Sequence, residues 1–101
     1  MRQVTWQEVL ARKDLIGGDI SSRECGTLFR GPIRDIQEDA KLVKFISPWH
    51  AFLDPNCEWE KCPMEFHYVV NKEVEFPHDL GDGRISFFLP YIGQCTISPR
   101  I

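Results

Sequence analysis

No stretch of the 101-residue sequence is both long and apolar enough to span a bilayer as a helix, which takes about 20 apolar residues. The N-terminus also lacks the basic segment and following apolar run of a secretory signal. We therefore expect a cytoplasmic location and no membrane partner. Because the cytosol keeps thiols reduced, the four cysteines are expected to be free, although Cys57 and Cys62 could close a short loop under oxidation.

Basic residues are outnumbered by acidic ones, whereas a nucleic-acid-binding surface needs clustered Lys and Arg. The formal net charge is −3, from 12 Lys and Arg against 15 Asp and Glu, and residues 35–79 carry four lysines against ten acidic residues. We expect no nucleic-acid partner unless the arginines of residues 1–34 converge. The acidic middle of the chain instead favours a basic protein, a basic peptide or a cationic small molecule.

Sequence signatures of catalysis are missing as well. The chain has no G-x-S-x-G nucleophile motif and no glycine-rich loop for phosphate. Paired carboxylates such as Glu58 and Glu60 are typical of a solvated strand face rather than of an acid and base pair. His78 and Asp79 are adjacent, so their side chains would diverge in an extended chain. A non-enzymatic protein is therefore the expectation.

Residues 26–46 predict a β-hairpin around which the rest of the chain is organised. Two apolar runs, 28–36 and 42–46, flank the polar segment 37–40, whose length and polarity suit a hairpin loop. Gly31-Pro32 interrupts the first run, and because proline removes a ladder donor we expect the chain to bulge or to lie at a sheet edge there, with a kink that divides the run in two. The hairpin should therefore coil strongly, as strands do in small, partly open barrels.

The flanking segments predict one short helix and several further strands. Thr5 to Glu8 has the T-x-x-E form of a capping box and precedes apolar residues that should dock on the sheet. Residues 19–24 are polar and suit a loop or a short edge strand. Alternation or apolar content predicts strands over residues 64–70, 73–76, 85–89 and 94–98.

These elements predict a mainly β (α+β) fold in a single domain spanning residues 1–101. The N-terminal helix and its linker would occupy residues 1–18, and a β-rich body residues 19–101. The expected architecture is a short helix packed on a small antiparallel, SH3-like roll or partly open barrel of six or seven strands. A two-layer α+β arrangement is the alternative.

The most suggestive ligand-binding feature is an aromatic segment that also carries carboxylates. Trp49, Phe52 and Trp59 fall in an irregular stretch beside the acidic residues Glu58 and Glu60. An exposed aromatic patch rimmed by carboxylates suits a cationic group or a basic peptide. We therefore predict an interaction or ligand-binding module for a protein, a peptide or a cationic small molecule, with homodimerisation left open. The competing interpretation is that the tryptophans plug the ends of the barrel.

A second set of residues has the chemistry of a metal site. Cys57, Cys62 and His67 are each five positions apart, and His50 lies upstream. Thiolate and imidazole groups are ligands that zinc favours, although the four residues between the cysteines lie at the loose end of zinc-knuckle spacing. The competing interpretation is that the cysteines are small apolar residues and that His67 lies on a strand surface. A small metal-binding protein or enzyme is therefore the alternative function.

Overall fold

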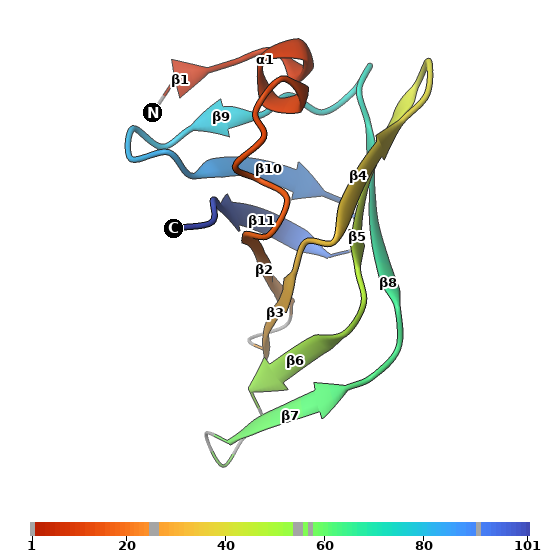
Figure 1. Ribbon diagram of the computed structural model, residues 1–101, viewed down its shortest axis with the longest axis vertical. Coiled ribbons are helices and arrows are strands. Elements are labelled where there is room, and N and C mark those ends of the chain that lie inside the picture. Colours follow the sequence, from red (N-terminus) through yellow and green to blue (C-terminus); the bar gives the residue numbers. More distant parts are fainter. Residues whose placement is uncertain (1, 25–26, 54–55, 57, 91) are drawn as a thin grey trace.

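The computed structural model describes residues 2–24, 27–53, 56, 58–90 and 92–101, with the backbone alone at positions 24 and 27 (Figure 1). The described residues form one short helix and eleven strands. Their bounds are β1 Arg2–Gln3, α1 Trp6–Leu10, β2 Asp19–Glu24, β3 Thr27–Pro32, β4 Asp35–Glu38, β5 Leu42–Ser47, β6 His50–Leu53, β7 Trp59–Cys62, β8 Phe66–Asn71, β9 His78–Asp79, β10 Ile85–Leu89 and β11 Gly93–Ser98. No helix in this part of the chain is long and apolar enough to cross a membrane.

The strands form two open antiparallel sheets. The large sheet has the order β1-β9-β10-β11-β2-β3-β6-β7, and the small sheet has the order β4-β5-β8. The predicted mainly β class is confirmed, and within the described residues neither sheet closes into a barrel. The predicted count of six or seven strands is too low, whereas the SH3-like form stays a prediction.

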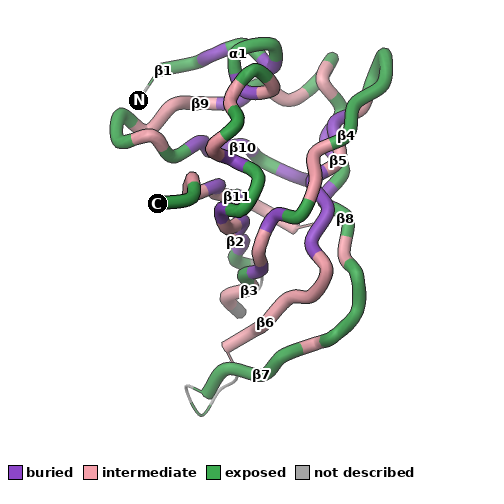
Figure 2. Tube along the Cα trace, viewed as in Figure 1, coloured by how far each residue is buried: buried purple, intermediate pink, exposed green. Residues whose placement is uncertain are grey.

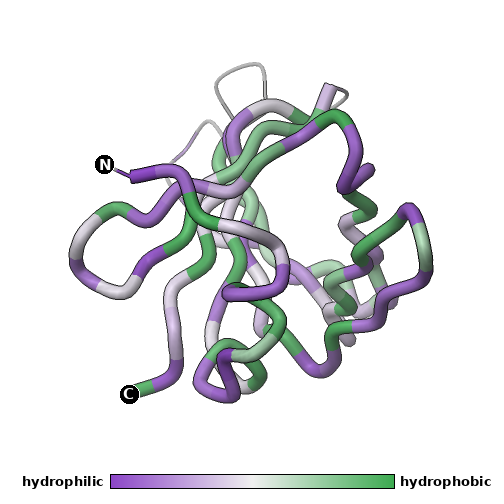
Figure 3. Tube along the Cα trace, turned by 90° about the horizontal axis from the view of Figure 1, so that it is seen from above, coloured by the Kyte–Doolittle hydropathy of each residue, from purple (hydrophilic) through white to green (hydrophobic). Residues whose placement is uncertain are grey.

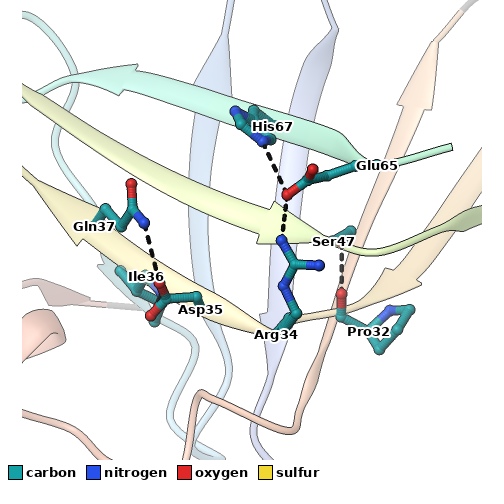
Figure 4. Close-up of polar contacts among 8 residues, drawn as sticks. All are labelled: Pro32, Arg34, Asp35, Ile36, Gln37, Ser47, Glu65 and His67. Atoms are coloured by element: carbon teal, nitrogen blue, oxygen red, sulfur yellow. Dashed lines mark hydrogen bonds and ion pairs between the residues drawn. The ribbon is translucent and has the colours of Figure 1, made fainter.

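Three stretches of chain bend from one sheet into the other, which is why the strand count is high. β3 continues into β4, β5 into β6 and β7 into β8 (Figure 1). The first of these bends follows Gly31-Pro32, where β3 ends, so the predicted kink is confirmed, whereas the β2–β3 register passes through both residues without a bulge. Next to it, the Ser47 hydroxyl donates a 2.5 Å hydrogen bond to the Pro32 carbonyl (Figure 4).

The predicted hairpin is the β4–β5 pair, although Gln37 and Glu38 of the predicted loop belong to β4. Glu38 lies opposite Val43 in its register. The Asp39 carboxylate accepts hydrogen bonds of 2.8 Å from the backbone N–H groups of Lys41 and Leu42. These two hydrogen bonds are the main cause that lowers the pKa of Asp39. The polar loop is therefore closed by its own aspartate, which is the usual role of this residue in turns.

The core lies between the two sheets and beneath α1, where buried positions concentrate in Figure 2. Three rings meet there, Trp6 of α1, Phe45 of β5 and Phe87 of β10, with centroid distances of 5.4 to 6.4 Å. The indole N–H of Trp6 also donates a 2.7 Å hydrogen bond to the Glu75 carbonyl. Hydrophobic and hydrophilic residues alternate along much of the chain (Figure 3), as half-buried strands require.

The predicted start of the short N-terminal helix is confirmed. The Thr5 hydroxyl accepts a 3.1 Å hydrogen bond from the backbone N–H of Glu8, which is one half of a capping box. The helix ends at Leu10, within two turns of its start. A helix this short depends on the burial of Trp6 and Val9 rather than on its own propensity.

Two strand predictions are wrong. Residues 19–24 form β2, which lies in the interior of the large sheet between β11 and β3 rather than at an edge or in a loop. Residues 73–76 form no strand, because the chain turns there through hydrogen bonds from the N–H groups of Val74 and Glu75 to the Asn71 carbonyl. The alternating pattern of residues 73–76 therefore marks an exposed turn.

Candidate binding site

The predicted aromatic segment lies on β6 and β7, at the end of the large sheet opposite β1 (Figure 1). Directly opposed residues of antiparallel strands point to the same face, and successive residues alternate. We call the face of the large sheet that packs on the core its inner face and the opposite face its outer face. Buried Cys95 lies on the inner face, and the residues opposed to it on successive strands are Ser22, Phe29, Phe52 and Glu60. Phe52 and Glu60 therefore point to the inner face as well. Trp59, next to Glu60, points to the outer face.

Both tryptophans of this segment already face a cation of the protein itself. The Lys61 ammonium lies 4.5 Å from the ring centroid of Trp49, and the Arg30 guanidinium lies 6.0 Å from that of Trp59. These distances are within the range of cation–π attraction. Because Lys61 alternates with Glu60, Lys61 lies on the same face as Trp59, and the outer face therefore carries Trp59 together with these two cations.

Phe52 and Glu60, two of the other predicted binding residues, lie on the face of the sheet opposite that of Trp59. Phe52 is half-buried, and its ring packs against that of Phe29 at a centroid distance of 6.1 Å. Glu60 is exposed on the inner-face side, opposite Phe52. Glu58, which precedes β7, is exposed as well. The structure therefore does not place Glu60 as a carboxylate rim around Trp59.

Two of the four predicted metal ligands lie opposite each other. His50 and Cys62 are cross-strand partners on β6 and β7. The His50 ring packs against the rings of Phe29 and Phe66, with centroids 6.1 and 5.1 Å away. Its Nδ1 atom is buried and has no hydrogen-bond partner in the described part of the chain. Aromatic packing thus determines the surroundings of His50.

His67 lies elsewhere, on the exposed side of β8. Its Nε2 atom is 3.4 Å from the Glu65 carboxylate, which also pairs with Arg34 (Figure 4). Hydrogen bonding from His67, and then from Arg34, lowers the pKa of Glu65. Cys57 lies outside the described residues, and among those described no three His, Cys, Asp or Glu side chains could share a metal ion. The zinc site stays a prediction.

Three shallow hollows adjoin one another on the outer face of the large sheet, and together we term them the outer trough. The first, of about 150 Å³, is lined by Phe76 and Phe88. The second, of about 250 Å³, shares Gln94 with the first, and the third, of about 240 Å³, shares Ser21 with the second. Trp59 lines the third. The outer trough therefore has aromatic side chains at both ends.

Polar side chains occupy the trough between these ends. The Gln94 amide donates a 2.8 Å hydrogen bond to the Ser86 hydroxyl, and Arg30 donates one of 2.8 Å to Asp19. Ser86 lies opposite His78 on the neighbouring strand. Within the described residues no hydrogen bond joins the Ser86 hydroxyl to the His78 imidazole, so the pair lacks the contact that activates a serine nucleophile.

Phe76 is a trough residue that the sequence did not identify, and Phe88 lay outside the predicted site residues, as an aromatic side chain that could join the patch. Phe88 falls on the face of residues 85–89 opposite the apolar core positions, which is the available signal. Phe76 belongs to a different, irregular segment, and only the fold brings the two together. No protein-family model, curated protein or solved structure matches this chain.

Proposed function

We propose that the chain is a non-enzymatic ligand-binding module and that the outer trough is its binding site. The observation that supports this is the exposure of large aromatic side chains at both ends of one trough, 47% for Trp59, 49% for Phe76 and 53% for Phe88. Single exposed apolar residues are ordinary on protein surfaces. Three that line adjoining hollows indicate a surface on which a ligand would bury apolar area, at about 25 cal/mol per Å².

The nucleophiles near the trough support binding rather than catalysis. Ser86 accepts its hydrogen bond from Gln94, an amide that cannot serve as a general base. The Cys95 thiol is fully buried on the inner face, and burial raises its pKa to about 12. A thiol with that pKa holds no significant thiolate at neutral pH.

The cations over the tryptophans bear on the class of ligand. A cationic group that approached Trp49 or Trp59 would meet the positive charge of Lys61 or Arg30. The electrostatic attraction that makes an aromatic surface bind cations is therefore already used within the protein. An uncharged ligand that packs on the rings is better supported by this arrangement.

NMR with a library of small neutral fragments tests the proposed site. Fragments that bind should shift the indole N–H signal of Trp59 together with the backbone amides of Ser21 and Thr96, because all three lie on the outer face. The Trp6 indole should not move, since it is buried and bonded to Glu75. Fragment-induced shifts that cluster on another surface, or the absence of any bound fragment, would contradict the proposal.

A second candidate function rests on β7, the terminal strand of the large sheet. All of its residues except Cys62 are exposed, and no strand pairs with its outer edge in the described part of the chain. Such an edge can pair with β7 of a second copy of this chain across a two-fold axis, which would continue the sheet. We propose this homodimer as the alternative use of the aromatic segment.

Proline substitutions at two adjacent positions test the homodimer. In an antiparallel edge strand, every second residue points its backbone N–H and C=O groups away from the neighbouring strand. Of the adjacent residues Glu60 and Lys61, one therefore points both groups away from β6. Proline at that position leaves the β6–β7 pair intact and removes the donor that a second copy needs. Sedimentation equilibrium should show that the wild-type protein is a dimer. Of the two variants Glu60→Pro and Lys61→Pro, the one that keeps the wild-type melting temperature should be a monomer. A monomeric wild type at high concentration would refute the dimer.

A further inference from the structure

We infer that the ligand of the outer trough is a neutral oligosaccharide, an inference that rests on the proposed function and names its ligand class. Four features of the trough point to it: balanced charge, planar and hydroxyl-bearing polar side chains, exposed aromatic faces at both ends, and a length that exceeds one sugar ring. Each feature is a property of described side chains or strands.

The charged side chains that line the trough balance one another. Arg23 and Arg30 are its cations, and Asp19 and Glu75 are its anions. Arg30 and Asp19 form an ion pair of 2.8 Å, and Lys61 lies outside the lining. A nucleic-acid strand needs several unopposed Lys and Arg for its phosphates. Balanced charge therefore favours a ligand without net charge.

The polar groups of the trough match the hydrogen-bonding capacity of sugar hydroxyls. Each hydroxyl of a sugar both donates and accepts, as the Thr96 side chain does, whereas the Ser21 hydroxyl already donates a 3.4 Å hydrogen bond to the Thr96 carbonyl and keeps its capacity to accept. The Gln94 amide and the paired Asp19 and Arg30 add planar donors and acceptors in fixed positions. A ligand with hydroxyls on neighbouring carbons can satisfy such mixed groups without burying an unpaired charge.

The aromatic ends supply the apolar part of the contact. A sugar ring has a flat face of C–H groups that carry slight positive charge, and the face of an aromatic ring is negative. Phe76 and Phe88 at one end, and Trp59 at the other, are each about half-exposed, so they retain area for contact, although Arg30 lies 6.0 Å from the Trp59 ring centroid and leaves Trp59 mainly its apolar area. From β10 to β7 there are five interstrand steps of about 4.8 Å, roughly 24 Å. An oligosaccharide can reach both ends, whereas a monosaccharide cannot.

The backbone beneath the trough disfavours a peptide as the ligand. β11, β2 and β3 each pair with a strand on both sides, β3 with β6 at Phe29 and Arg30, so most of their backbone groups are used within the sheet. A peptide lying across them would find few backbone partners for its own N–H and C=O groups. The side chains alone would have to satisfy that backbone, which the mixed hydroxyl and amide lining suits less well than sugar hydroxyls.

NMR titration with neutral hexasaccharides of glucose, mannose, galactose and N-acetylglucosamine is the test. At least one should shift the Trp59 indole signal, bind more tightly than its monosaccharide, and keep its affinity at high salt. Trp59→Ala and Phe88→Ala should each weaken its affinity about tenfold or more, as truncated aromatic anchors do. Val69→Ala is the matched control, because Val69 is 41% exposed on the small sheet, and it should leave the affinity unchanged.

Several outcomes would overturn the inference. Binding of no hexasaccharide while neutral fragments still bind the outer face would refute the ligand class and leave the proposed function standing. Binding of neither would refute both. Salt-sensitive binding of a single-stranded oligodeoxynucleotide in place of the neutral sugars would show a polyanion site. Equal loss of affinity in Val69→Ala and Phe88→Ala would place the sugar away from the trough.

Discussion

Replacing Gly31 by alanine would test the bend that joins the two sheets. A Cβ atom at Gly31 would lie 2.6 Å from the Trp49 carbonyl oxygen and 3.3 Å from the His50 Cα atom. Both are backbone atoms, so a strand must shift to admit the methyl group. Overpacking of this kind costs about 1–3 kcal/mol, and the stiffer unfolded chain offsets about 0.4–1 kcal/mol of it. We expect a net loss of about 1–2 kcal/mol, which lowers the melting temperature by about 4–16 °C.

Thermal and urea unfolding measure the loss, and the Trp49 indole signal in NMR shows whether the bend has moved. Gly81→Ala is the matched control, because nothing lies within 4 Å of a Cβ at Gly81 while its φ of +94° strains any other residue. Both variants should lose stability, but only Gly31→Ala should shift the Trp49 signal. A Gly31→Ala protein as stable as the wild type, with that signal unchanged, would refute the close approach of β3 to residues 49–50.

Burial raises the pKa of Tyr68 from 10.0 and that of Cys95 from 9.0, in each case to about 12. In the unfolded chain both groups lose their protons at the lower pKa values, so raising the pH favours the unfolded state. The free energy of unfolding should stay constant up to about pH 8 and be about 2 to 3 kcal/mol smaller at about pH 10.5. Urea denaturation at both pH values measures this, and equal stabilities would contradict the burial. Thr5→Ala removes the helix cap and should cost about 1 kcal/mol, whereas Thr5→Ser should keep most of the stability. Phe87→Ala removes the ring between Trp6 and Phe45 and should cost about 3–5 kcal/mol; a loss below about 1 kcal/mol would show that the three rings do not pack together.

The sequence predicted those parts of the fold that local chemistry determines. The β4–β5 hairpin follows from a polar loop that Asp39 closes, and the bend follows from Gly31-Pro32. Alternation identified β8, β10 and β11 because each of these strands has one buried face. The same alternation failed over residues 73–76, where apolar side chains alternate with glutamates but no strand among the described residues pairs with the segment. Alternation indicates two faces and cannot show that a partner strand exists.

The candidate site was harder to predict because its faces depend on register. Treating residues 49–60 as irregular placed Glu60 beside Trp59, whereas β7 alternation puts them on opposite faces. Nothing local to Trp59 shows that Arg30 lies over its ring, since that contact needs the β3–β6–β7 order of the large sheet. The trough likewise exists only once β10, β11, β2 and β3 lie side by side. The acidic residues in the middle of the sequence suggested a cationic ligand. A ligand contacts only one face of the sheet, however, and the tryptophan rings already lie next to Arg30 and Lys61.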